Sequence, residues 1–160
     1  MKILTQTRVT KNDLLIIPFY TGKNPKSTQK EAIENRHHAD FEGKENESVM
    51  LYQKDKITPR ILLVGLGEQQ KETTESWRNA GGTAAKHIKK AMQTVAFIPP
   101  IENLELMGAF IEGFLLAQYK FEAFITAPKR KQHTIKQLNV IITNKKSTPA
   151  LIQKFEEIQT

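Results

Sequence analysis

Two glycines follow a strand-like run in a way that could let the backbone bind phosphate. Ile61 to Leu66 is apolar apart from one glycine, Gly65 and Gly67 stand at its end, and a helix pattern begins several residues later. With no side chain on the two glycines, the N–H groups of Gly65, Leu66 and Gly67 could approach a phosphate. The third position of the dinucleotide-binding fingerprint is Gln70, however. The alternative is a plain turn between a strand and a helix.

Basic side chains form a second candidate site. Residues 1–122 hold 17 basic and 15 acidic side chains, whereas residues 123–155 hold seven basic and no acidic ones. Most of the seven flank the apolar run 138–142: Lys129, Arg130, Lys131, Lys136, Lys145 and Lys146. Such a cluster could contact the phosphates of a nucleic acid. No aromatic residue is interleaved to stack bases, so the alternative is two solvated loops at the ends of one strand.

Histidines and carboxylates gather between residues 37 and 47, but not at the spacing of a known metal site. They are His37, His38, Asp40, Glu42, Glu45 and Glu47. We expect charged loop residues here, and we predict no metal ligand and no catalytic residue in the chain. His87 lies among lysines, where we expect a solvated helix face, and His133 has no evident partner.

Length and composition predict one globular domain. The 160 residues are 39% hydrophobic and 26% charged, which suits a single core. The absence of cysteine excludes disulfide bonds and thiolate chemistry. The first residues show no secretory signal, and no apolar stretch reaches the roughly 20 residues that span a bilayer. We expect a cytoplasmic protein with no membrane partner.

The order of the elements predicts the fold class. Apolar runs indicate strands at residues 2–9, 14–19, 49–52, 60–67, 95–98 and 138–142. Pro18 marks a bulge or a strand end, and Thr28 with Glu31 makes a capping-box pattern for a short helix. A long apolar helix follows from about Glu102 to Tyr119. This order predicts an α/β protein, a three-layer α/β/α sandwich with a mixed, largely parallel sheet.

A helix of small residues should cover that sheet. Thr73 and Thr74 offer N-cap oxygens, and one stripe follows at helical spacing, made of Trp77, Ala80, Gly81, Ala84, Ile88 and Ala91. Each of the adjacent glycines, Gly81 and Gly82, costs roughly 1 kcal/mol relative to alanine inside a helix. We therefore expect a very close neighbour, namely the sheet itself, and we expect Trp77 to lie in the core.

The last residues predict a short helix that needs a partner. Thr148 suits the N-cap and Pro149 the first helical position. One stripe is apolar: Leu151, Ile152, Phe155 and Ile158. About three turns are marginal for an isolated helix, so packing must hold it. We expect this stripe to be exposed on the domain and to serve packing between domains.

Several short motifs together give a family resemblance over most of the chain. They are Phe41-Glu42-Gly43-Lys44, Arg60 to Gly67, Ala80-Gly81-Gly82 with Ala84-Ala85, Glu112-Gly113 with Leu115-Leu116, and Tyr119-Lys120-Phe121. With these motifs in this order, the chain resembles the amino-terminal domain of the leucine aminopeptidase (cytosol aminopeptidase) family. The resemblance implies a macro-domain-like fold over residues 1–147, and the start of a linker helix to a catalytic domain over residues 148–160.

The resemblance also implies where the chemistry lies. The family hydrolyses peptides at a centre of two divalent metals, zinc, manganese or magnesium, in a carboxy-terminal domain marked by an Asn-Thr-Asp-Ala-Glu-Gly-Arg stretch, which is missing here. We expect this chain to hold no cofactor and no activity. Its implied partners are its own catalytic domain and the sister subunits of a homohexamer, in which it would serve assembly, substrate access or regulation. The alternative is a module that binds nucleic acid or ADP-ribose.

Overall fold

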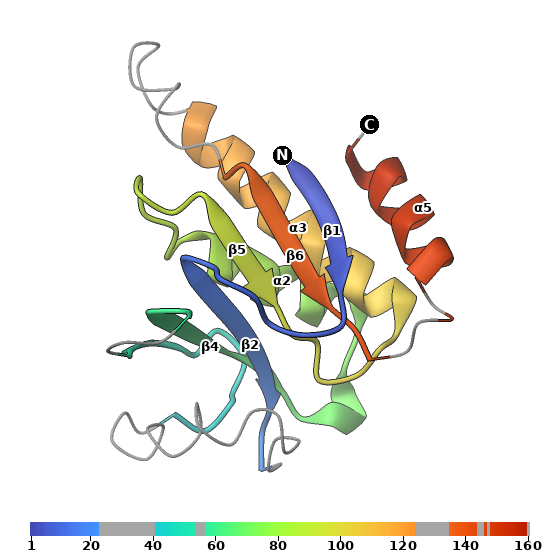
Figure 1. The fold of residues 1–160 in the computed structure, drawn as a ribbon. Helices are drawn as coiled ribbons and strands as arrows, with labels where there is room; N and C mark the ends of the chain where they lie inside the picture. Colours follow the sequence, from blue (N-terminus) through green and yellow to red (C-terminus); the bar gives the residue numbers. More distant parts are fainter. Residues whose placement is uncertain (23–40, 54–56, 124–134, 144–145, 147, 160) are drawn as a thin grey trace.

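The computed structural model describes residues 1–22, 41–53, 57–123, 135–143, 146 and 148–159 (Figure 1). Its strands are β1 (Lys2–Gln6), β2 (Leu14–Tyr20), β3 (Ser48–Tyr52), β4 (Arg60–Gly67), β5 (Thr94–Phe97) and β6 (Gln137–Ile141). Its α-helices are α2 (Thr74–Ala85), α3 (Leu104–Ala123) and α5 (Thr148–Gln159), and a short 3-10 helix, η3 (Gln69–Lys71), precedes α2. The predicted short helix near Thr28 lies outside the described residues.

The six strands form one mixed sheet in the order β1-β6-β5-β2-β4-β3. Every neighbouring pair is parallel except β3 with β4, which is antiparallel. The prediction of an α/β fold with a mixed, largely parallel sheet is therefore confirmed. The irregularity expected at Pro18 occurs one residue later, where the register between β2 and β4 shifts between Phe19 and Tyr20.

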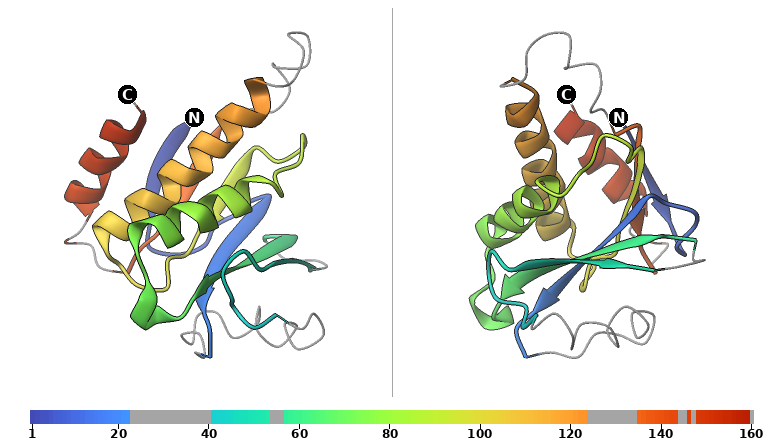
Figure 2. Two further views of the ribbon diagram at one scale, coloured as in Figure 1. Left: turned by 180° about the vertical axis from the view of Figure 1, so that it is seen from behind. Right: turned by 90° about the vertical axis from the view of Figure 1, so that its left-hand side faces the viewer.

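The described helices all lie on the same face of the sheet (Figure 2). Alternation along β2 shows the two faces: Leu14 and Ile16 join the cluster of α2, α3 and α5, whereas Leu15 and Ile17 join a second cluster with Phe41 on the opposite face. A second helix layer, as in the predicted three-layer sandwich, is not formed by the residues that the structure describes. No helix in these ranges is long and apolar enough to cross a membrane.

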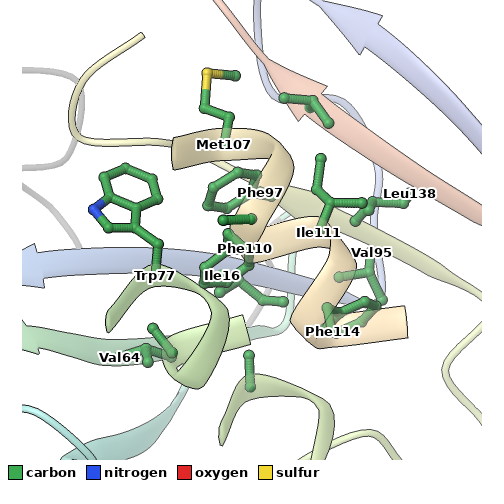
Figure 3. Close-up of a cluster of buried hydrophobic side chains, with 14 of the residues drawn as sticks. Ile16, Val64, Trp77, Val95, Phe97, Met107, Phe110, Ile111, Phe114 and Leu138 are labelled. Carbon is green, nitrogen blue, oxygen red and sulfur yellow. The ribbon is translucent and has the colours of Figure 1, made fainter. Parts of the chain in front are cut away.

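Among the described helices, α3 contributes the most buried side chains to the cluster that covers one face of the sheet. Figure 3 shows Phe110, Ile111 and Phe114 directed toward strand residues such as Val95. The rings of Phe97 and Phe110 stack with centroids 4.2 Å apart. Leu104 is 36% exposed, because it is the first residue of α3 and lies at the end of the core.

Gly81 of α2 packs against α3, whereas Trp77, Ala80 and Ala84 of the same stripe are buried in the core that the helices share with the sheet. A Cβ built on Gly81 would lie 2.0 Å from the carbonyl oxygen of Phe110, and one on Gly113 would lie 2.0 Å from that of Arg78. Each glycine thus lets its helix touch the backbone of the other, closer than any side chain would allow. The expectation of a very close neighbour is confirmed for Gly81, where that neighbour is α3 and not the sheet, but not for Gly82, whose Cβ would meet nothing closer than 3.9 Å.

The amino-terminal half of α2 follows the prediction and its carboxyl end does not. Thr73 is the N-cap and exchanges side-chain and backbone hydrogen bonds with Ser76, and Trp77 is fully buried. The helix ends at Ala85, so Ile88 and Ala91 do not continue its stripe. Ile88 still packs on the core from the following turn, whereas Ala91 is exposed.

Candidate functional site

The carboxyl ends of β2 and β4 meet at one edge of the sheet, the usual ligand-binding edge of parallel α/β proteins. Here the chain's own segment 41–47 occupies the place beside the two glycines. Gly65 N–H donates to the Glu47 carbonyl at 2.8 Å, and Gly67 N–H donates to the Gly43 carbonyl at 2.9 Å. A Cβ on Gly65 would lie 1.8 Å from the Lys44 carbonyl oxygen.

These contacts explain why residues 65 and 67 of β4 are glycines. The missing side chain of Gly65 admits the backbone of Lys44, and Gly67 has a φ of 81°, a conformation that favours glycine. The N–H groups of both are already donated within the chain. The phosphate-contacting loop of Gly65, Leu66 and Gly67 therefore stays a prediction, and a phosphate there would have to replace the bonds that the two glycine N–H groups make to residues 43 and 47.

The same segment contains an anion-binding arrangement that its own carboxylate fills. Successive N–H groups of Glu42, Gly43 and Lys44 donate to the Glu47 carboxylate at distances between 2.9 and 3.2 Å. Converging backbone N–H groups of this kind bind anions. The sequence analysis had placed Glu47 among solvated loop carboxylates. Gly43 and Asn46 have positive φ angles, which shape the turn. In the sequence, only the presence of a glycine and an asparagine in this segment indicated such a turn.

A buried polar contact joins the end of β2 to the start of α2. The Tyr20 hydroxyl donates to Glu72 Oε2 at 2.5 Å, and Trp77 Nε1 donates to the same oxygen at 3.2 Å. Burial and the Glu72 carboxylate together raise the pKa of Tyr20, so the phenol stays protonated and keeps donating. Sequence analysis missed Glu72; its place directly before the N-cap Thr73 was the available signal.

His87 is not on a solvated helix face, contrary to prediction. It follows the end of α2, and its Nε2 lies 2.9 Å from Ser48 Oγ on β3. Partial burial lowers the pKa of His87, and the ammonium groups of Lys89 and Lys86 lower it further. The neutral ring is thereby favoured, and the pair fastens the edge strand to the helix layer.

Asp13 performs a comparable role at the amino-terminal ends of the two interior strands β2 and β5. Its Oδ2 accepts from Gln93 N–H at 2.8 Å and from both N–H and hydroxyl of Thr94 at 3.0 Å. Partial burial raises the pKa of Asp13, but these hydrogen bonds outweigh it and the net pKa is lowered. The carboxylate ties the start of β2 to the start of β5.

Of the predicted basic cluster, only Lys136 and Lys146 lie within the described residues. Lys129, Arg130, Lys131 and Lys145 lie outside the described residues. Lys136 is exposed directly before β6, and Lys146 is exposed beyond its other end. The two described members are thus separated by the length of a strand, and the cluster as a whole remains a prediction.

A two-metal centre does not fit the described residues. No group of three or more His, Asp or Glu side chains in these ranges is placed to hold a metal ion. His37, His38 and Asp40 lie outside the described part of the chain. Of the others in that sequence cluster, Glu47 binds backbone N–H groups and Glu42 pairs with Lys44 at 2.5 Å.

Helix α5 is buried where the sequence analysis expected it to be exposed. Leu151 is 1% and Phe155 is 3% exposed, both within the domain's own core, and Ile158 is half-buried near Gly108 of α3. For these three, the predicted exposed stripe is wrong, because α5 uses that side against β1 and α3. Ile152, by contrast, is 44% exposed.

An open pocket of about 580 Å³ lies between α5 and the start of β1. Ile152 and Phe155 line it from the helix, Ile3 lines it from β1, and Ile135 lines it from the residues just before β6. Lys2, Lys136 and Glu156 also line this pocket. Its wall is therefore mixed, with apolar, basic and acidic side chains.

The comparisons with known proteins agree with one another. A family model described as "Cytosol aminopeptidase family, N-terminal domain" matches residues 20–128. The probable cytosol aminopeptidase of Protochlamydia amoebophila is 30% identical over 151 residues, which cover 84% of this chain and 30% of the relative. That of Agrobacterium fabrum is 39% identical over 87 residues, 52% of this chain and 18% of the relative.

Solved structures show the same fold. A mutant of tomato leucine aminopeptidase superposes with a TM-score of 0.77 at 21% identity, over 99% of this chain and 35% of that chain. The bottromycin maturation enzyme BotP, in complex with Mn, gives a TM-score of 0.63 at 15% identity over 92% of this chain and 30% of that one. The present chain thus spans about a third or less of the proteins it matches.

Proposed function

Because this chain belongs to the cytosol aminopeptidase family, in which it matches the N-terminal domain, we propose that it is an accessory domain that performs no catalysis itself. The single observation that carries the proposal is the extent of the match, which covers this domain and about a third or less of the relatives. Peptide hydrolysis at two divalent metals, zinc, manganese or magnesium, would then take place in another part of a longer protein.

The use of polar groups in the described residues supports this. The carboxylates of Glu47, Glu72 and Asp13 each accept hydrogen bonds that fasten one segment of the fold to another. The N–H groups of Gly65 and Gly67 donate hydrogen bonds that hold the 41–47 segment to β4. These polar groups already make hydrogen bonds within the domain. This agrees with an accessory domain, in which polar groups stabilise the fold.

We further propose that the outer side of α5 contacts the catalytic domain. Ile152 is exposed at the open pocket beside β1, whereas its helix neighbours Leu151 and Phe155 anchor the helix to the domain. Through such contacts the domain would serve assembly of a cytoplasmic homohexamer, access of peptides to its interior, or regulation.

An association experiment tests the proposal. The purified chain is mixed with the separately produced catalytic portion of a cytosol aminopeptidase from the same genome, and the complex is measured by sedimentation velocity. We expect a complex that Ile152→Asp weakens and the matched exposed change Gln153→Glu does not. No complex, or equal binding by both variants, contradicts the proposed contact.

Nucleic-acid binding stays an alternative proposal, supported by the basic segment and by the exposure of Lys136 and Lys146. It predicts an affinity for duplex DNA that falls steeply with salt. Absence of binding at about 50 mM salt removes it, since electrostatic contacts are strong at that ionic strength. An ADP-ribose site has less support, because the glycine N–H groups at the end of β4 are already donated.

A further inference from the structure

The parallel strands all begin at one edge of the sheet, which we call the amino edge. β1, β6, β5, β2 and β4 are parallel neighbours in this order, so their amino ends lie side by side. Backbone hydrogen bonds join the first members of this row. Lys2 N–H donates to the Lys136 carbonyl at 2.9 Å, and Lys136 N–H donates to the Gln93 carbonyl at 2.8 Å. Lys2 and Lys136 are therefore neighbours at the amino edge.

Basic side chains outnumber acidic ones at the amino edge. The exposed lysines that stand at or shortly before the starts of β1, β2, β5 and β6 are Lys2, Lys11, Lys89, Lys90 and Lys136. Among the described residues, the carboxylates near this edge are fewer: Asp13, Glu156 and Glu157. Asp13 already accepts hydrogen bonds from the N–H groups of Gln93 and Thr94. The described part of the edge therefore carries a net positive charge.

The side chains that the structure does not describe do not reverse this sign. Those that adjoin the amino edge along the chain belong to residues 54–56, before β4, and to residues 119–134, before β6. Together these stretches contain six basic and two acidic residues. The positive charge of the edge therefore does not depend on where these side chains lie.

Helix α5 ends at the same edge. Its first residue, Thr148, lines a pocket with Gln6, the last residue of β1, whereas Phe155 and Glu156 line a pocket with Lys2, the first residue of β1. The helix therefore runs antiparallel to β1, and its carboxyl end lies near the amino terminus of the chain, as Figure 1 shows. The chain matches the N-terminal domain of its family and covers 30% of one relative. A polypeptide that continues α5 would therefore leave the domain at the amino edge.

We propose that the amino edge is the surface on which this domain docks the catalytic portion of its own protein, and that the docked surface presents carboxylate side chains. The inference rests on the proposed function and adds the chemistry of the contact. Lys2 and Lys136 line the same pocket as Ile152, which is 44% exposed. An apolar side chain over Ile152, with carboxylates at the two lysines, gives the apolar centre and polar rim that protein interfaces share.

A covalent connection makes such a contact sufficient. Exposed ion pairs are individually weak, but a domain that is joined to its partner by a short linker meets it at an effective concentration of about 1 mM. A contact with a dissociation constant of roughly 100 µM between separate pieces is therefore mostly closed in the joined protein. Complementary charge also disfavours wrong partners, since like charges repel at a mismatched surface.

Sedimentation velocity tests the proposal with the whole chain and a separately produced catalytic portion, from the same genome, that hydrolyses leucine p-nitroanilide. We expect the double variant Lys2→Glu with Lys136→Glu to weaken the complex by about tenfold or more, because like charges then face each other. Lys2→Gln with Lys136→Gln should weaken it less, since the repulsion is missing.

The matched control makes the same change in net charge at the opposite ends of the strands. Lys44 and Lys71 are exposed there, beside the end of β4 and directly after it. The eight residues of β4 separate the two edges, and at about 3.3 Å per residue this exceeds the Debye length of about 10 Å at 0.1 M salt. Lys44→Glu with Lys71→Glu should therefore leave the affinity unchanged.

Salt gives an independent measurement. Raising the salt from about 0.1 M to about 1 M shortens the Debye length from about 10 Å to about 3 Å. The complex of the unchanged chain should therefore weaken at high salt. The complex of the Lys2→Gln with Lys136→Gln variant should weaken less, because its edge has lost two of the charges that salt screens.

Three outcomes would contradict the inference. A complex that neither the glutamate variant nor salt weakens overturns it, yet the proposed function stands if Ile152→Asp still weakens that complex. Equal weakening by the amino-edge and control variants also overturns it, because net charge alone would then explain the loss. If the chain and the active catalytic portion form no complex at all, both this inference and the contact proposed for α5 are wrong.

Discussion

Replacing Gly81 with alanine should separate the two helices whose contact organises the helix layer. The new Cβ would lie 2.0 Å from the Phe110 carbonyl oxygen and 2.9 Å from the Phe114 nitrogen, where ordinary contact begins at 3.4 Å. Both atoms belong to backbone, so α2 and α3 must move apart. Overpacking of this kind costs about 3 kcal/mol, and the better helix propensity of alanine returns about 1 kcal/mol. We expect a net loss of about 2 kcal/mol.

The neighbouring glycine supplies the control. A Cβ on Gly82 would meet nothing closer than 3.9 Å, so Gly82→Ala should gain up to about 1 kcal/mol from helix propensity alone. Urea and thermal unfolding followed by far-UV circular dichroism measure both variants. For a chain of this size we expect the melting temperature of Gly81→Ala to fall by roughly 4–8 °C. Equal stability of the two variants would refute the close contact between the helices.

Three further predictions concern carboxylates and the histidine. Glu72→Gln should lower the free energy of unfolding by about 1–3 kcal/mol, because Tyr20 loses a charged acceptor; urea unfolding monitored by Trp77 fluorescence measures this, and an unchanged midpoint speaks against the contact. Asp13 has a folded-state pKa below its ordinary 3.8, so its contribution is complete above about pH 4 and lost as the pH falls through the folded-state pKa. Asp13→Asn should flatten that acid decline, and an unaltered decline in acid titrations of stability would count against it. Because the folded-state pKa of His87 lies below 6.5, the unfolded chain binds the extra proton first, and stability should fall as the pH drops below about 6.5. In His87→Gln this fall should shrink in the same titration; if it persists in full, other groups cause it.

The strands, the helices and the α/β fold class could be predicted from the sequence, because apolar runs and helix caps are local patterns. β4, α3 and the Thr73 cap follow directly from such patterns. The element that packs against Gly81 could not be predicted in the same way. A stripe of small residues indicates that some element lies very close, but it does not indicate which one. Gly113 on the second helix was the missing half of that signal.

Two other differences have the same origin. The apolar stripe of α5 could pack on its own domain or on another, and only the three-dimensional arrangement assigns Leu151 and Phe155 to the core and leaves Ile152 outside. For Glu47, the partners of the carboxylate are backbone N–H groups, which every residue except proline carries. Sequence therefore showed a charged loop where the structure has a filled anion nest.

We propose that this chain, which matches the N-terminal domain of the cytosol aminopeptidase family, performs no catalysis itself, and an activity assay of the chain alone tests this most directly. The purified 160-residue chain is incubated with leucine p-nitroanilide and, in turn, manganese, zinc and magnesium. We predict no release of p-nitroaniline above the buffer rate with any metal. Metal-dependent hydrolysis that co-purifies with the chain and disappears on its removal would contradict the claim.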